Sequence, residues 1–368
     1  MSVTGDSETG GAPRWWRDPS WWRRAALTYA LAFAGALLAD AVGLPLPWML
    51  GPFFLCGLVA ATGVTLVSVP LGRELGQLAI GLAVGMRFTA ATLVATLSLL
   101  PAMLGATVYV MAYTMIGAFL FRPLAGCRAS TAFFATAAGG VADMANVAEQ
   151  KGADAASVAV VHALRVSCTV AIVPILAITF GTGGSVIGAP SADPGTLLLL
   201  PLVIAGCFGA VWLLKRTPLP NPWLIGPMFL AIGLGASGIA RVPVPPFVVL
   251  PAQLLIGTWL GCCFRREVLL GLPRVAMAGI VVALFMIAAA FGGANVLALL
   301  TGLPLTTSFL ALAPAAVTEM VITAKAMQLD AEIVTAFHVM RIFLVCSTIL
   351  VVYRLYTALR RLGGPRAS

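Results

Sequence analysis

The 368-residue chain is too apolar for a water-soluble protein, because 60% of its residues are hydrophobic, 10% are charged and the mean hydropathy is +1.02. Soluble domains carry about 25% charged residues. The net charge of +9 lies in short loops and at the chain ends, which indicates the positive-inside pattern of membrane proteins rather than nucleic-acid binding. The apolar runs are continuous instead of alternating, so we predict an all-α integral membrane protein.

In chain order, the composition predicts five parts. A cytoplasmic tail (residues 1–23) precedes a first membrane repeat (24–180), a linker rich in Gly and Pro (181–196), a second membrane repeat (197–356) and a cytoplasmic C-terminal tail (357–368). Each repeat contains five apolar segments long enough to suggest membrane spans. They lie at 25–42, 47–66, 72–88, 99–121 and 156–180, and at 197–214, 222–239, 247–264, 275–301 and 332–356.

The two repeats share three sequence anchors at an offset of 175 to 176 residues. The stretch PWMLGP at 47–52 matches PWLIGP at 222–227, and QLAIG at 77–81 matches QLLIG at 253–257. The stretch from Thr131 to Arg165 matches the stretch from Thr307 to Arg341. This pattern indicates an internal duplication.

An interrupted apolar segment precedes the last span of each repeat, at 131–149 and 307–327. If these segments are re-entrant, each repeat has five spans and the repeats have inverted topology; if they cross, each has six. With a cytoplasmic N-terminus, the five-span arrangement leaves only Arg87 and Arg241 of the basic loop residues outside. We therefore predict inverted repeats, each with five transmembrane helices and one broken helix, and both chain ends in the cytoplasm.

Charged residues inside the interrupted segments and the spans that follow them are candidates for a binding site. Asp143 aligns with Glu319, and Arg165 with Arg341. A charge in the membrane costs about 2.5–3.5 kcal/mol unless it is paired or faces water, so pairing is expected. Asp143 and Glu319 are predicted to bind a coupling ion near the midplane.

Small residues and a proline are expected to break the interrupted segments, at Gly139, Gly140 and Pro314. Broken backbone is tolerated in a membrane only where protein or a water-filled cavity surrounds it, and the half-helix that follows favours an anion at its N-terminus. Equivalent breaks in two repeats are typical of secondary transporters. The alternative is that small residues only allow close helix packing.

His162 and Arg165 are spaced i, i+3, as are His338 and Arg341, so each pair shares one helix face. The arginines are interpreted either as ligands of a substrate anion or as a lock on the broken segment through its carbonyl groups and the acids. The histidines are interpreted either as groups that titrate near neutral pH or as structural residues. Both alternatives stay open.

Metal and redox sites are not predicted. The seven cysteines are scattered without metal-ligand spacing, and two histidines are too few for a copper or iron centre. We expect no metal, no cofactor and no enzymatic activity.

The doubled GGVADM and HALR stretches, with the paired Pro-Trp-x-x-Gly-Pro stretches, resemble the AbrB duplication family of bacterial membrane proteins, from about residue 25 to 356. The resemblance implies a multi-pass protein of the bacterial inner membrane. Members are often named as regulators of gene expression or as ammonia monooxygenases, and the arrangement also looks like that of organic-anion symporters with inverted repeats. The segment Pro314-Ala315-Ala316 departs from Ala138-Gly139-Gly140, so the two breaks need not be equivalent in function.

The leading hypothesis is a secondary transporter of a small solute, such as an organic or amino-acid-like anion, coupled to H⁺ or Na⁺. The expected partners are this solute, the coupling ion and the lipid bilayer, without nucleic acid; a second copy of the chain, as a homodimer, is kept open. The alternative is a membrane-embedded regulatory or sensor protein that affects gene expression indirectly.

Overall fold

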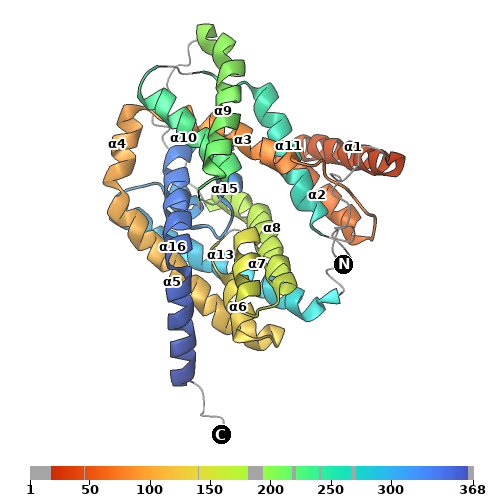
Figure 1. Cartoon of the computed structure of the whole chain (residues 1–368), viewed down its shortest axis with the longest axis vertical. Helices are drawn as coiled ribbons and strands as arrows, with labels where there is room; N and C mark the ends of the chain where they lie inside the picture. Colours follow the sequence, from red (N-terminus) through yellow and green to blue (C-terminus); the bar gives the residue numbers. More distant parts are fainter. Residues whose placement is uncertain are drawn as a thin grey trace.

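The computed structural model describes residues 18–44, 46–139, 141–180, 194–217, 221–239, 242–264, 266 and 271–363, and this part of the chain is helical without strands (Figure 1). Residues 181–193 of the predicted linker (181–196) and Gly140 lie outside the described residues. The helices of the first half are α1 (Pro19–Ala41), α2 (Pro47–Ala61), α3 (Gly72–Gly85), α4 (Ala90–Ser98), α5 (Leu100–Ala125), α6 (Ala129–Thr136), α7 (Val141–Gln150) and α8 (Ala155–Phe180). Those of the second half are the 3₁₀ turn η2 (Pro194–Leu199), α9 (Leu200–Leu214), α10 (Pro222–Ala236), α11 (Pro246–Cys262), α13 (Pro273–Thr301), α14 (Leu305–Leu312), α15 (Val317–Ala326) and α16 (Ala331–Gly363).

The helix boundaries recur between the halves where the sequence repeats. Helices α2 and α10 each have 15 residues, each begins with proline, and each follows a residue in the left-handed conformation, Leu46 at φ 54° and Asn221 at φ 55°. Proline suits the first helical position, because a backbone N–H at that position would have no partner within the helix. The boundaries of α6 and α7 also reappear 176 residues later, in the ends of α14 and the start of α15.

Helix boundaries differ from the sequence-based expectation at several places; α16, for example, runs to Gly363, inside the predicted tail at 357–368. Helix α1 begins at Pro19, inside the predicted tail, because Asp18 caps it by accepting a hydrogen bond from the Ser20 amide at 2.8 Å. The short helix α4 was not predicted; Thr89 starts it with a capping box, and it bends away from α3 by 95°.

Five helices of the described residues are long and apolar enough to cross a membrane, and seven are when the two bent pairs each count as one span. Helices α2, α10 and α11 are apolar but have only 15 to 17 residues, fewer than the roughly 20 that a 30 Å core requires. All ten predicted spans are thus helical, and the protein is an all-α membrane protein. It remains a prediction that all ten helices cross the membrane and that the two repeats are inverted.

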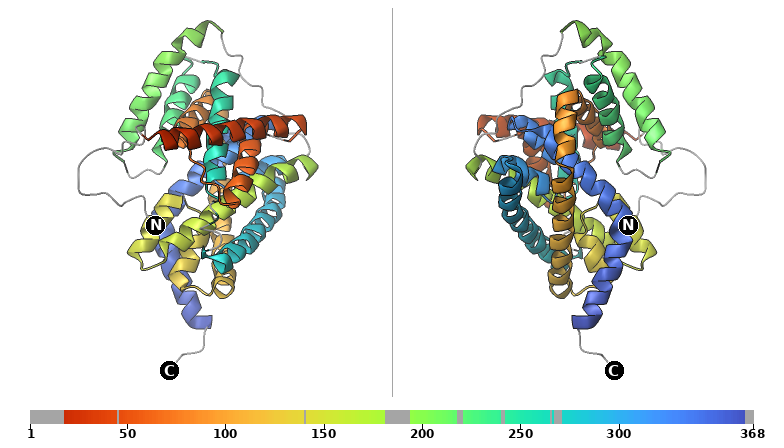
Figure 2. Two further views of the ribbon diagram at one scale, coloured as in Figure 1. Left: turned by 90° about the vertical axis from the view of Figure 1, so that its right-hand side faces the viewer. Right: turned by 90° about the vertical axis from the view of Figure 1, so that its left-hand side faces the viewer.

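Helix packing divides the chain into two bodies that each take helices from both halves. The upper body in Figure 1 contains α1, α2, α3, α9, α10 and α11, in which α2 packs on α11 and α3 on α10. The lower body contains α5 to α8 and α13 to α16, in which α13 packs on α5 and α8, and α16 on α5. Figure 2 shows the same division from two other sides. The contacts are reciprocal between equivalent helices, because α2 of the first half packs on α11 and its equivalent α10 packs on α3.

Glycines permit the close approach within the upper body. A Cβ atom at Gly81 of α3 would lie 2.4 Å from the carbonyl oxygen of Leu224 on α10. The equivalent atom at Gly257 of α11 would lie 2.2 Å from the oxygen of Met49 on α2. Small residues at helix contacts let backbones approach in membrane proteins. The repeated QxxxG stretch is therefore a contact between the halves within the upper body.

The predicted topology has a direct test in the linker. A reporter enzyme that folds only outside the cytoplasm, inserted between residues 181 and 194, is expected to be active, because an odd number of spans separates the linker from a cytoplasmic N-terminus. The same reporter fused after residue 363 is expected to be inactive. An inactive reporter in the linker would contradict the inverted arrangement, because six spans per repeat would place the linker in the cytoplasm.

Candidate functional site

The two broken segments end at equivalent residues and in the same conformation. Helix α6 ends before Ala137, with φ −54° and ψ 145°, and α14 ends before Ala313, with φ −57° and ψ 138°. Ala313 precedes Pro314, and a residue before proline is driven out of the helical region into extended backbone. The chain resumes as a helix at Val141 and Val317. The predicted interruption of both segments is confirmed.

Arg165 of α8 binds the carbonyl groups that the first break exposes. Its Nη1 donates to the oxygens of Ala137 at 2.7 Å and Thr136 at 3.3 Å, and Nη2 lies 3.5 Å from the oxygen of Gly139. The last carbonyls of a helix have no partner within it, so the guanidinium satisfies them and places positive charge at the negative end of the α6 dipole.

Arg341 of α16 does the same for the second break. Its Nη1 donates to Ala313 O and its Nη2 to Ala315 O, both at 2.8 Å. A tyrosine of the first half completes the set, because the Tyr113 hydroxyl donates to Leu312 O at 2.9 Å. The carbonyl groups at both breaks therefore accept hydrogen bonds from side chains of the protein.

Both histidines act on the arginine beside them. His162 Nε2 lies 2.8 Å from Phe134 O, and His338 Nε2 lies 2.8 Å from Leu310 O. A carbonyl can only accept, so Nε2 carries the proton, and Nδ1 accepts from Nη2 of Arg165 at 3.1 Å and of Arg341 at 2.6 Å. Each neutral imidazole thus orients a guanidinium, which is the arrangement expected of structural histidines.

Glu319 does not join this bonding pattern. Within the described residues, neither Arg165 nor Arg341 forms an ion pair with an acid. Glu319, in the first turn of α15, is 2% exposed, and its Oε2 has no hydrogen-bond partner. The side chain of Asp143 lies outside the described residues. In the part of the chain that the structure describes, the two arginines are therefore paired with carbonyl groups and histidines, and not with the acids that the sequence suggested. Glu319 has no bonded counter-charge there.

A cavity of about 690 Å³ lies where the two breaks meet and separates the two bodies. The lower body contributes both breaks (Ala138, Gly139 and Pro314 to Val317), Glu319, Arg165 and Arg341. The upper body contributes Arg73 of α3, Asn221 before α10, and Trp259, Leu260 and Cys263 of α11. The cavity thus brings together residues from both halves, including most of the predicted site.

Arg73 and Trp259 were not predicted as site residues. The Arg73 guanidinium lies 4.1 Å from the centre of the Trp259 ring, a cation–π contact that holds its charge against the cavity wall. In the sequence, Arg73 lies at the start of the predicted span 72–88. Its place one helical turn before Gln77, on the repeated α3 stretch, is a sequence signal that could have assigned it to a helix facing the interior.

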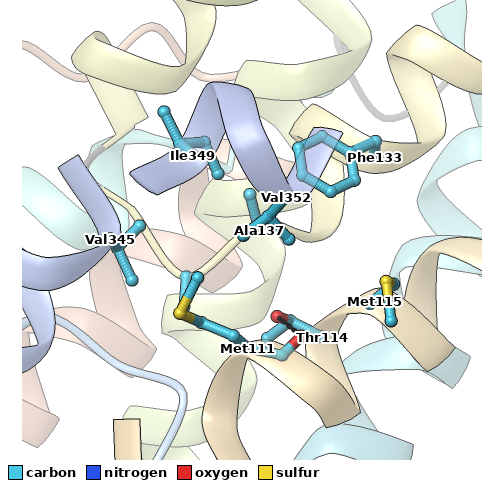
Figure 3. A pocket seen from close by; sticks show the side chains of 9 residues that line it. Met111, Thr114, Met115, Phe133, Ala137, Val345, Ile349 and Val352 are labelled. Carbon is cyan, nitrogen blue, oxygen red and sulfur yellow. Dashed lines mark hydrogen bonds between the residues drawn. The ribbon is translucent and has the colours of Figure 1, made fainter. Parts of the chain in front are cut away.

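A second hollow in the lower body is too small and too apolar to bind a ligand. It measures about 10 Å³ and lies between α5, the first break and α16, where Met111, Phe133, Val345 and Ile349 surround it (Figure 3). A bound water needs at least that volume and two or more polar partners. Thr114, the polar residue of its lining, already donates to Met111 O.

The described part of the chain therefore defines a multi-pass helical membrane protein with a cavity at two broken helices, and four charged side chains are part of the cavity lining. The chain matches the family described as "Transition state regulatory protein AbrB" over residues 1–119 and 71–357, and it belongs to this AbrB family. The resemblance seen in the sequence is thus confirmed.

Two relatives are similar over most of their length. One is "Uncharacterized protein YhjN" of Bacillus subtilis (strain 168), 26% identical in an alignment of length 359 that covers 89% of this chain and 91% of the relative. The other is "Putative regulator AbrB" of Escherichia coli (strain K12), 24% identical in an alignment of length 316 that covers 84% of this chain and 89% of the relative.

Proposed function

We propose that this protein is a secondary transporter of a small organic anion, and not an enzyme. The observation that carries the proposal is the cavity, whose described lining has three arginines, Arg73, Arg165 and Arg341, and one acid, Glu319. A volume of 690 Å³ falls in the range of about 300–1,000 Å³ that small-molecule sites occupy. An excess of fixed positive charge in such a volume favours an anion.

The N-terminus of α15 adds to the preference for an anion. Ala316 is its N-cap and has no capping side chain, and Ala316 and Val317 line the cavity. Unpaired amides at the start of a helix bind carboxylates and phosphates. Arg165 and Arg341 are already bound to carbonyl groups, so they supply charge, whereas Arg73, on the opposite wall, is placed to meet the solute directly.

Glu319 is proposed as the site of the coupling ion. A carboxylate buried in this way is stable when it carries a proton or binds a cation. With Glu319 beside the anion-binding region, entry of H⁺ or Na⁺ removes a negative charge that would repel the solute. This links the two binding events, as coupled transport requires.

We place the protein in the bacterial inner membrane with both ends in the cytoplasm, without a nucleic-acid partner. The printed names of the family and of the E. coli relative refer to regulation. Movement of a signal metabolite would connect such an effect to transport, and a membrane-embedded sensor without flux is the alternative function.

The proposal is tested by flux in proteoliposomes. A thermal-shift screen of mono- and dicarboxylates and amino acids first identifies a solute that stabilises the folded protein. Glu319→Gln keeps the shape of the side chain and is expected to reduce uptake of that solute at least about tenfold, as loss of a coupling group requires. Asp143→Asn is expected to act in the same direction.

The matched control is Glu149→Gln, which removes an exposed carboxyl group from α7, and it is expected to leave uptake unchanged. Full uptake by Glu319→Gln would contradict the assigned role. If no solute is moved by the wild type, the sensor alternative is favoured.

A further inference from the structure

Within the described residues, the cavity lining includes exposed and half-buried residues at one entrance, and five of them have equivalents in the other half. On the cavity side, Ala156 at the start of α8 is exposed, and Ala159, Asn221, Trp259 and Cys263 are half-buried. These five residues, the cavity mouth, come from the starts of α8 and α10 and the end of α11.

The five equivalent residues are packed together instead. They lie 175 or 176 residues away, as Leu46, Ala83, Arg87, Glu332 and Thr335. Glu332 is 8% exposed, Thr335 2%, and Leu46 and Ala83 4% each. Cys263 and Ala156 of the cavity mouth correspond to Arg87 and Glu332, which form an ion pair with Nε 2.6 Å from Oε1.

Helix packing has the same asymmetry. Helix α3, which leads to Arg87, packs against α15 and α16. In the described residues, the equivalent helix α11 does not pack against α7 or α8 as α3 packs against α15 and α16. The cavity lies between α11 and α8. The two bodies are thus in contact at one entrance and apart at the other.

We propose that the Arg87–Glu332 ion pair closes a second entrance to the site, the counterpart of the cavity mouth, and breaks when the protein changes access. This rests on the proposed function, because it specifies how the transport site is reached from each side. The ion pair joins the upper body to the lower one and is 20% and 11% exposed at its two side chains, so it stabilises the contact between the bodies. In the predicted topology, Arg87 lies on the outer side, and the structure is the state open to the cytoplasm.

The proposal includes a second state of the protein, in which the two repeats exchange their conformations. In that state α11 would pack against α7 and α8, and α3 would leave α15 and α16. Nothing at Ala156 or Cys263 can form an ion pair there. The asymmetry of charge therefore biases the protein towards the observed state until ligands favour the other one.

The test measures thiol labelling at both entrances in purified protein in detergent. Thr335→Cys places a reporter at the closed entrance, and native Cys263 reports on the cavity mouth. N-ethylmaleimide labelling is read at each position by mass spectrometry, so the other native cysteines can remain. In this parent, position 335 is expected to react more slowly than Cys263.

Arg87→Gln and Glu332→Gln in this parent each leave one buried charge unpaired, and each is expected to raise the 335-to-263 labelling ratio about tenfold. Both are made because Lys325 also interacts electrostatically with Arg87 and Glu332. The charge exchange Arg87→Glu with Glu332→Arg is expected to restore the parent ratio. Arg354→Gln, at an exposed position of α16, is the control and leaves it unchanged.

A converse variant tests whether higher labelling at position 335 results only from local disruption around the substituted ion pair. Ala156→Glu with Cys263→Arg builds the ion pair at the cavity mouth and leaves the original pair intact, and it is expected to raise labelling at position 335 several-fold. A ratio unchanged by both neutralising variants, or raised equally by the charge exchange, overturns the proposal. These outcomes do not depend on any solute, so failure of the entrance appears in labelling and failure of the transport function appears in flux.

Discussion

Replacing Arg341 by alanine is expected to lower the free energy of unfolding by about 3 kcal/mol or more. The change removes the donor from two buried carbonyl groups, Ala313 O and Ala315 O, and from His338 Nδ1. Each buried acceptor without a donor costs about 1–3 kcal/mol, and the break has no regular helix to supply another. The thermal unfolding temperature of the purified protein in detergent measures the loss.

The matched control is Arg354→Ala, which removes an exposed arginine from the same helix, and its unfolding temperature is expected to stay near that of the wild type. Arg341→Lys is expected to lie between the two, because one ammonium group lacks the planar fork that reaches two carbonyls and an imidazole together. Equal unfolding temperatures for Arg341→Ala and Arg354→Ala would show that the break does not depend on the guanidinium.

The substitution Gly257→Ala is expected to destabilise the upper body by about 3 kcal/mol, the upper end of ordinary overpacking. The new Cβ would lie 2.2 Å from the Met49 carbonyl oxygen and 3.0 Å from its carbon, so α11 and α2 must move apart. The atoms in the way are backbone and cannot rotate aside. Thermal unfolding and the yield of monodisperse protein measure the effect.

The same substitution at Gly233 of α10 is the control, because a Cβ there would meet nothing within 4 Å. Alanine is the better helix former by about 0.5–1 kcal/mol, so Gly233→Ala is expected to be neutral or slightly stabilising. If both alanine variants unfold at the same temperature, close backbone approach at Gly257 is not what holds the halves together.

The sequence predicted the features that depend on local chemistry and on repetition. The breaks near Gly139 and Pro314 follow from backbone preferences, and the arginines and histidines follow from charge placed at matched positions in apolar runs.

The sequence did not predict how the halves interleave. Arg87 and Glu332 are 245 residues apart, and their contact depends on the packing of α3 against a helix of the other half. Arg73 reaches the cavity for the same reason, because α3 and α11 together form the wall opposite the breaks. Periodicity and hydropathy describe single helices, whereas these contacts depend on tertiary packing.

Because both bodies draw helices from both halves, the order of synthesis restricts when either can form. The surface of α2 around Met49 stays uncovered until α11 has been made, some 200 residues later. The surface of α3 around Gly81 likewise stays uncovered until α10 has been made. Helices α5 and α8 likewise wait for α13. The first half must therefore enter the bilayer as an unfinished assembly whose small-residue faces touch lipid. We expect the time between insertion of the first half and insertion of the second half to determine what fraction of the protein molecules assembles correctly in the cell. The stability of the finished protein is expected to matter less.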